Sequence, residues 1–132
     1  MRLRRIVLET ELLDRPRELW RILLHELLHF AWVRLGNPER RRWEEVLRAE
    51  LAAGARGEVG WSAEHRKRDL RPDDWLKRTR RWREYACESF CDSGAFCLAG
   101  LRRHVESTLA GRFLARRRRW FRNLSAGGRI LI

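Results

Sequence analysis

The chain lacks the segments that mark secreted or membrane-spanning proteins. It begins MRLRRIVLETELLDRP, with early arginines but no apolar stretch of signal-peptide length. Its longest apolar run, residues 19–35, is broken by charged residues and histidines, so it does not predict a membrane span. The three cysteines, Cys87, Cys91 and Cys97, are odd in number and close together, which fits free thiols better than a disulfide framework. We therefore expect a cytoplasmic protein with no transmembrane segment.

Lysine is scarce as well, because only Lys67 and Lys77 stand among the 30 basic residues that face 18 acidic ones. The net charge of +12 is thus almost wholly arginine. A GC-rich genome produces such a bias, and so does a nucleic-acid or other acidic partner. A surplus of basic residues is by itself a weak guide to partners, so composition allows nucleic acid as a partner without favouring it. The run RRRRWFR, residues 116–122, is expected to form a solvated basic helix face, with a nucleic-acid or acidic-lipid surface as the alternative.

The 132 residues suit one domain, and they show neither an internal repeat nor a boundary for a second domain. Short strands are predicted at 3–9 and 129–132, with another around 58–61. Helices are predicted at about 14–35, 38–53, 72–100 and 108–124, the first capped by Asp14 and the third divisible into two pieces. A long loop, 54–72, separates the second and third helices. This pattern predicts an α+β fold, mostly helical, with a small sheet packed on the active-site helices.

The segment HELLH, residues 25–29, is the strongest functional signal. Residues four apart on a helix are separated by about 40° of rotation and about 6 Å of rise, so His25 and His29 point the same way. Two neutral imidazoles one turn apart can bind one Zn²⁺ ion. Glu26 is turned about 100° from His25, where its carboxylate can take a proton from a metal-activated water.

The neighbours of this segment are apolar nearly all round the helix, which predicts a central helix. Burying a glutamate and two histidines is costly unless partners compensate for the lost water. A metal ion supplies that compensation. The surroundings therefore favour a metal site over a chance occurrence of the motif.

A catalytic zinc needs a third protein ligand and an open position for water. The metzincin pattern would place Gly at 32 and His at 35, but the chain has Trp32 and Leu35, so that family is excluded. The third ligand must come from elsewhere. The candidates are His65, His104 and the acids of the later helix.

The stretch YACESFCDSGAF, residues 85–96, supplies the best of these candidates. Glu88 and Asp92 are four apart on one face of a predicted helix, among apolar and small neighbours. Glu88 can reach the metal, and Asp92 can then accept a hydrogen bond from the outer N–H of a ligand histidine.

HELLH followed by ESFCD on a later helix resembles the gluzincins, the thermolysin-like clan of zinc metallopeptidases. The chain's small size is similar to minimal, single-domain forms of that clan. The resemblance implies His25, His29 and Glu88 as zinc ligands, Glu26 as general base and Asp92 as the residue that orients a ligand. It covers two short motifs and leaves the loop and the last helix unmatched.

A second resemblance leaves the third ligand open. The ImmA/IrrE-like metallopeptidases also carry HExxH and a later ligand helix, and aligning them on Phe90 places that ligand at Glu84. Glu84 and Glu88 are one turn apart, so both could face the metal. Only Glu88 has an acid, Asp92, four residues later.

Further side chains near the motifs could take part in the chemistry. Tyr85, His65 and His104 are candidate donors to the oxyanion that peptide hydrolysis generates. Cys87 and Cys91, four apart, could bind a metal or sense oxidants, although small buried residues in a helix contact are the simpler interpretation.

The sequence thus predicts a zinc metallopeptidase with one Zn²⁺ per chain and a peptide or protein substrate. The alternative is a basic nucleic-acid-binding protein with a structural or vestigial zinc site. Glu26 distinguishes the two, because a structural zinc site is closed by four protein ligands and needs no acid beside a water.

Overall fold

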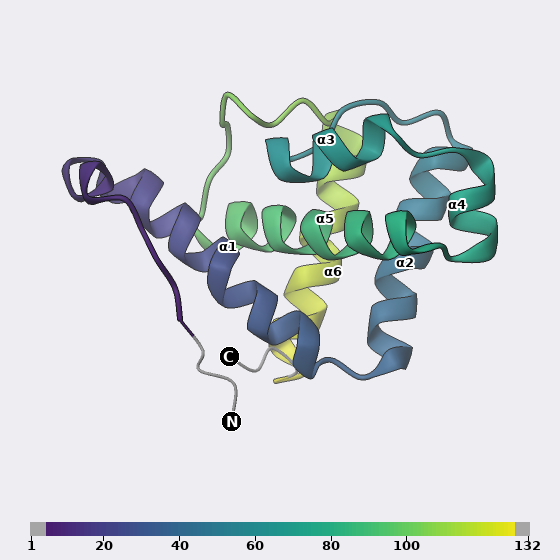
Figure 1. Ribbon diagram of the computed structural model, residues 1–132, viewed down its shortest axis with the longest axis horizontal. Helices are drawn as coiled ribbons and strands as arrows, with labels where there is room; N and C mark the ends of the chain where they lie inside the picture. Colours follow the sequence, from purple (N-terminus) through teal and green to yellow (C-terminus); the bar gives the residue numbers. More distant parts are fainter. Residues whose placement is uncertain (1–4, 129–132) are drawn as a thin grey trace.

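The computed structural model describes residues 5–128, which form one 3₁₀-helix and six α-helices. The elements in chain order are η1 (Thr10–Asp14), α1 (Pro16–Arg34), α2 (Asn37–Ala52), α3 (Trp61–Arg68), α4 (Pro72–Lys77), α5 (Arg80–Leu98) and α6 (Gly111–Ala126). Figure 1 shows α5 running through the middle of the molecule, and α1, α2, α3, α4 and α6 all contact it. None of the helices within residues 5–128 has the length and apolarity that crossing a membrane requires.

The expected small sheet is absent from residues 5–128, so the α+β prediction is wrong and the described fold is all-helical. Residues 5–9 have no strand partner, and the side chain of Val7 is 74% exposed. Near 58–61, Glu58 exchanges hydrogen bonds with Thr108, but Trp61 already begins α3. Short β-branched runs become strands only where a neighbouring strand and a face to pack against exist. The strand expected at 129–132 lies outside the described residues.

The four predicted helices are confirmed, with shifted ends. The third is divided into α4 and α5, the last begins at Gly111, and α1 is capped by the backbone of Arg15 instead of the side chain of Asp14. The predicted long loop was wrong, because it contains α3. That helix has no apolar stripe in its sequence, and only Ala63 on it is buried. Its stability therefore comes from docking on α5, which the local pattern does not reveal.

Small side chains let the central helix α5 lie close to its neighbours. The residues Ala86, Ser89, Ser93, Gly94 and Ala95 are all buried along it. A Cβ atom at Gly94 would lie 2.6 Å from Leu28 Cδ1 of α1 and 2.9 Å from Phe121 Cε1 of α6. Gly94 thus marks the crossing where α1 and α6 both approach α5, and this approach brings the histidines of α1 within reach of α5.

Arg117 is the least expected member of the core. It lies in the run predicted to be a solvated basic face, yet its side chain is fully buried. Its guanidinium bonds Glu50 through Nε at 2.9 Å and Nη2 at 2.8 Å, Glu58 through Nη2 at 3.0 Å, and Ser93 Oγ at 3.0 Å. The helix α6 has Phe113, Phe121 and Leu124 on the same buried side, so arginine fills the gap in that apolar stripe.

The buried charges of this group compensate one another. Complete burial by itself raises the pKa of Glu58, but the charge of Arg117 and its hydrogen bonds outweigh burial and lower that pKa. Tyr85 donates its hydroxyl hydrogen to Glu58 Oε2 at 3.0 Å. Two carboxylates share one guanidinium here, and the donors around them stabilise the remaining negative charge.

Replacing Arg117 with Met keeps much of the side-chain volume and removes the charge. We expect the free energy of unfolding to fall by about 3–5 kcal/mol, because the buried Glu50 and Glu58 lose the guanidinium that bonds them both. Urea denaturation at pH 7 measures this change in the free energy of unfolding.

The matched control is Arg116→Met on the same helix, where the side chain is exposed. Its effect should stay within about 0.5 kcal/mol. Equal stabilities of the two variants would contradict the central place of Arg117 in the core.

Candidate metal centre

The helix α1 presents two histidines at the edge of the face that it packs against α5. Leu24 and Leu28 are buried on this helix, and His25 and His29 follow each of them by one residue. Both imidazoles therefore emerge from the same side, with their Nε2 atoms 3.2 Å apart. The side chain of His25 is 11% exposed and that of His29 33% exposed, so the pair lies at the border between core and solvent.

Glu88 of α5 completes a group of three ligand atoms. Its Oε2 lies 3.3 Å from His25 Nε2, and its Oε1 lies 3.5 Å from His29 Nε2. Two ligands held about 2.0–2.1 Å from a tetrahedral ion are about 3.3 Å apart, so these separations fit one metal ion. The ligand atoms of His25, His29 and Glu88 all lie within 4.8 Å of one another, and the described chain therefore holds a group within metal-binding distance.

Asp92, one turn after Glu88 on α5, holds the other side of His25. Its Oδ1 lies 2.7 Å from His25 Nδ1, and its Oδ2 accepts a hydrogen bond from the backbone N–H of Ala63 at 3.0 Å. An acceptor at Nδ1 keeps one proton there, so the nitrogen left for a metal ion is Nε2, which faces Glu88. The same carboxylate therefore orients a ligand and caps the first turn of α3.

Gly60 makes this double contact sterically accessible. A Cβ atom at residue 60 would lie 2.4 Å from Asp92 Cγ, so no larger residue fits there without moving the carboxylate. Sequence reasoning missed Gly60, which it assigned to a loop. The available signal was the sequence GWSAE, where a glycine precedes a short helix with an acid in its first turn.

Glu26 follows His25, one of the three ligands, and both residues line a hollow of about 160 Å³. The hollow is lined by Arg21, Ile22, His25, Glu26, Trp61, Ser62, Asp92 and Glu106. Within residues 5–128 Glu26 makes no hydrogen bond or ion pair, so its carboxylate is available to a small molecule in the hollow. Trp61 at the start of α3 is 53% exposed and forms part of the wall.

The two glutamates that were candidates for the third ligand lie in different surroundings. Glu84, one turn before Glu88, is 47% exposed and bonds Arg80 Nε at 2.9 Å on the outer surface of α5. Only Glu88 lies against the histidines. Of the two glutamates, Glu88 is therefore the one that lies within metal-binding distance of both histidines.

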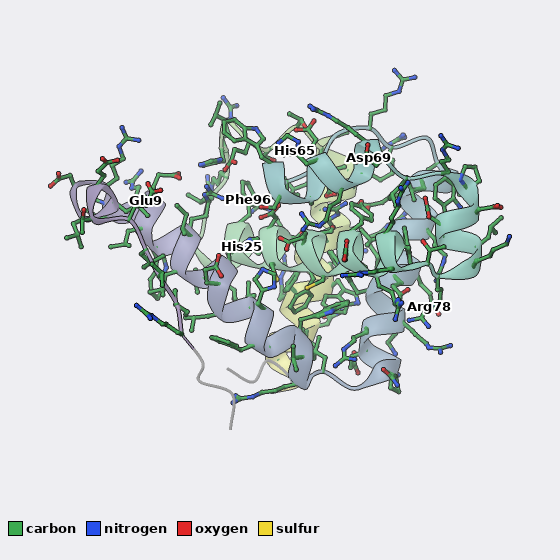
Figure 2. The ribbon with its side chains drawn as sticks, in the orientation of Figure 1. Glu9, His25, His65, Asp69, Arg78 and Phe96 are labelled. Atoms are coloured by element: carbon green, nitrogen blue, oxygen red, sulfur yellow. The ribbon has the colours of Figure 1, made fainter. Side chains whose placement is uncertain are left out.

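The three expected oxyanion donors lie in different surroundings. Tyr85 is buried with its hydroxyl on Glu58, away from the hollow. The ring of His104 is bonded to Glu18 through Nε2 and to the backbone N–H of Glu106 through Nδ1. His65 is exposed on α3, one turn after Trp61, and Figure 2 shows it on this helix, on the other side of α5 from the helix that carries His25.

A second group of possible metal ligands lies at the other ring nitrogen of His29, Nδ1. Cys87 Sγ lies 3.6 Å from His29 Nδ1, and Cys91 lies close enough for its thiol to join the same group within 4.8 Å. A hydrogen bond with Cys91 and another with His29 lower the pKa of Cys87 to about 6, against the effect of burial. All three cysteines of the chain are free thiols, as the sequence predicted.

No model of a known protein family, no curated protein and no solved structure matches this chain. The geometry of the described residues is therefore the ground for the functional conclusions that follow.

Exchanging single carboxylates on α5 tests the third ligand. Glu88→Gln should weaken zinc binding by more than about 100-fold, since loss of an outer partner alone costs about 10–100-fold. Affinity is measured by competition with a chromophoric chelator, in a Cys87→Ser, Cys91→Ser background so that no thiol binds the ion.

Glu84→Gln in the same background is the matched control and should leave the affinity unchanged, because Glu84 is paired with Arg80 at the surface. A stronger effect at Glu84 than at Glu88 would make Glu84 the ligand.

Raising the pH should strengthen zinc binding. Burial alone lowers the pKa of His25, but hydrogen bonds with Asp92 and Glu88 outweigh it and raise that pKa to about 10 in the metal-free protein. Zinc must displace this proton, so the affinity should rise by about tenfold per pH unit between pH 7 and pH 10 for His25 alone.

The stability of the metal-free protein has the opposite pH dependence and should fall as the pH rises. Because the folded-state pKa of His25 is raised, its pairing stabilises the fold fully below about pH 6.5 and is lost as the pH approaches 10. Asp92→Asn removes a negative charge from His25 and should flatten both pH profiles. Identical profiles in this variant and the parent would refute the pairing as their cause.

Proposed function

We propose that the protein is a zinc-dependent metallopeptidase that hydrolyses peptide bonds in the hollow beside His25. The observation that carries the proposal is an unpaired carboxylate, Glu26, next to a group of three ligand atoms from His25, His29 and Glu88. Neither part alone implies catalysis, since three-ligand groups also occur in passive sites. Their combination favours chemistry on a molecule in the hollow.

The donor set fits zinc. Two imidazole nitrogens and one carboxylate oxygen form the ligand set of a catalytic zinc site, and three protein ligands leave a position for substrate or water. A structural site would be closed by a fourth protein ligand. Bound at this group, zinc would supply Lewis-acid polarisation of a carbonyl and raise the acidity of a neighbouring water.

Glu26 is the general base in this proposal. Its carboxylate accepts a proton from the attacking water, whose oxygen forms a bond with the carbonyl carbon of the peptide. The C–N bond then breaks, and Glu26 delivers the proton to the leaving nitrogen. Asp92 holds the Nδ1 proton of His25 throughout, so the histidine keeps one tautomer and one orientation.

The walls of the hollow suit an extended peptide. Trp61 offers an exposed aromatic surface, and His65 lies one turn later on the same helix, where its ring can meet a substrate that passes Trp61. Of the three expected oxyanion donors, Tyr85 and His104 have other partners, so His65 stays the candidate for that role, and it lies outside the residues that line the hollow.

The nucleic-acid alternative has no specific observation in its favour. Arg117 of the basic run is buried, and Arg118 donates to the backbone oxygen of Leu101 at 2.8 Å. The stretch therefore serves the fold at two of its arginines and is not a continuous exposed basic face.

The three free thiols fit a reducing compartment, which supports the proposed cytoplasmic location.

Glu26→Gln tests the proposal directly. The amide keeps the size of the side chain but cannot accept a proton, so peptide hydrolysis should fall by about 10²–10⁴-fold with zinc content unchanged. Activity is followed on a fluorogenic peptide library, and zinc is quantified by elemental analysis of the same samples.

Glu45→Gln, at an exposed position of α2, is the matched control and should retain full activity. A zinc chelator should abolish the activity, and zinc should restore it. Undiminished hydrolysis by Glu26→Gln would contradict the assignment of Glu26 as the base. Absence of hydrolysis in the zinc-loaded parent would contradict the proposed peptidase activity.

A further inference from the structure

We propose that His29, Cys87 and Cys91 form a second metal site, selective for a thiophilic ion, that competes with the first group for the imidazole of His29. Cys87 and Cys91 have no role in the proposed catalytic chemistry, whereas His29 belongs to both groups. The competition rests on the proposed zinc group, and the experiment below separates the two.

The separations of the three ligand atoms are compatible with one metal ion. Cys87 and Cys91 are four apart on α5, so their thiols emerge on one side of the helix, as the histidines of α1 do on theirs. Cys87 Sγ lies 3.6 Å from His29 Nδ1, and the three ligand atoms lie within 4.8 Å of one another. A tetrahedral ion with one sulfur at about 2.3 Å and one nitrogen at about 2.0–2.1 Å holds these two atoms about 3.6 Å apart.

The ligand chemistry selects the ion. Two thiolates and one imidazole are soft and borderline donors, which favour Cu(I), Zn²⁺ or Cd²⁺ over Mg²⁺ or Ca²⁺. Binding of a divalent ion displaces the protons held among the two thiols and His29 Nδ1, and it forms two metal–sulfur bonds and one metal–nitrogen bond with no change of oxidation state. Cys91 is fully buried, but His29 is 33% exposed, so an ion can enter along the imidazole.

The competition follows from the two nitrogens of one ring. His29 Nε2 faces His25 and Glu88, whereas His29 Nδ1 faces Cys87. A neutral imidazole carries one proton, so when Nε2 binds a metal the proton stays on Nδ1 and points at the sulfur. An ion at the thiol site must displace that proton. Only the imidazole ring of His29 would then separate it from the ion bound at Nε2. Each ion therefore weakens the binding of the other.

Cys97 provides an internal comparison. It lies two turns further along α5 and lines a different hollow with Arg118, Phe121 and Arg122. It shares the helix and the thiol chemistry but has no histidine or second thiol in its group within the described residues. Any effect that depends on Cys87 and Cys91 but not on Cys97 is therefore specific to the site.

Cadmium is the probe for the experiment, because thiolate ligation produces a charge-transfer absorption band in the ultraviolet and nitrogen or oxygen ligation does not. The metal-free full chain is titrated with Cd²⁺ under argon with a phosphine reductant, and bound ion is counted by equilibrium dialysis. Circular dichroism checks that every variant keeps its helical content.

We expect the wild type to bind one Cd²⁺ tightly and a second at least tenfold more weakly. His25→Ala should bind one ion with the thiolate band. Cys87→Ser, Cys91→Ser should bind one without it, Cys97→Ser should match the wild type, and His29→Ala should lose at least tenfold in affinity at both groups.

Each group can fail separately. Absence of the thiolate band in the His25→Ala variant, with its helical content intact, would overturn the thiol site. Two equally tight ions in the wild type would overturn the competition. A Cys87→Ser, Cys91→Ser protein that binds no ion, beside a His25→Ala protein that binds one, would instead remove the proposed zinc group and leave the thiol site in place.

Discussion

The buried guanidinium of Arg117 is the interaction on which the rest of the structure depends. It joins α6 to Glu50 of α2, to Glu58 in the segment before α3 and to Ser93 of α5. These three partners lie in three separate segments of the chain. The Arg117 group therefore connects segments that local sequence patterns do not bring together. A buried cation between two carboxylates is stable only with this full set of contacts, because each charge left alone would be strongly penalised. The helices must therefore assume one arrangement.

This constraint extends to the metal centre through the segment that follows Glu58. With Glu58 anchored, Gly60 is placed against Asp92, and the backbone N–H of Ala63 donates to the same carboxylate. Asp92 in turn holds His25 Nδ1 at 2.7 Å. The orientation of a metal-binding imidazole thus depends on a contact chain that begins in the core, and the short helix α3 is both a wall of the hollow and a support for the ligand.

The central helix α5 contributes to two chemistries at once. Glu88 and Asp92 serve His25 and the three-ligand group, while Cys87 and Cys91, each one residue earlier, approach His29 from its other nitrogen. Consecutive residues on a helix differ by about 100° in direction, so acids and thiols address different sides of the same pair of histidines. The ring of His29 connects them, because its two nitrogens share one proton.

Local helix geometry lets the sequence by itself determine part of this protein. Four-residue spacing puts His25 beside His29 and Glu88 beside Asp92 in any α-helix, and Pro16 and Pro72 mark helix starts that the structure has. Both Glu84 and Glu88 lie on α5 one turn apart, and at that level only the spacing to Asp92 favoured Glu88. The approach of α1 to α5 placed the histidines against Glu88 and depends on contacts between distant segments, whereas Glu84 pairs with Arg80 four residues earlier on the same helix. The same holds for the absence of the expected sheet from residues 5–128, the helix in the predicted loop, the hydrogen bond between Tyr85 and Glu58 and the burial of Arg117. Each depends on which surfaces meet, because burial and charge compensation are properties of packed elements and not of sequence spacing.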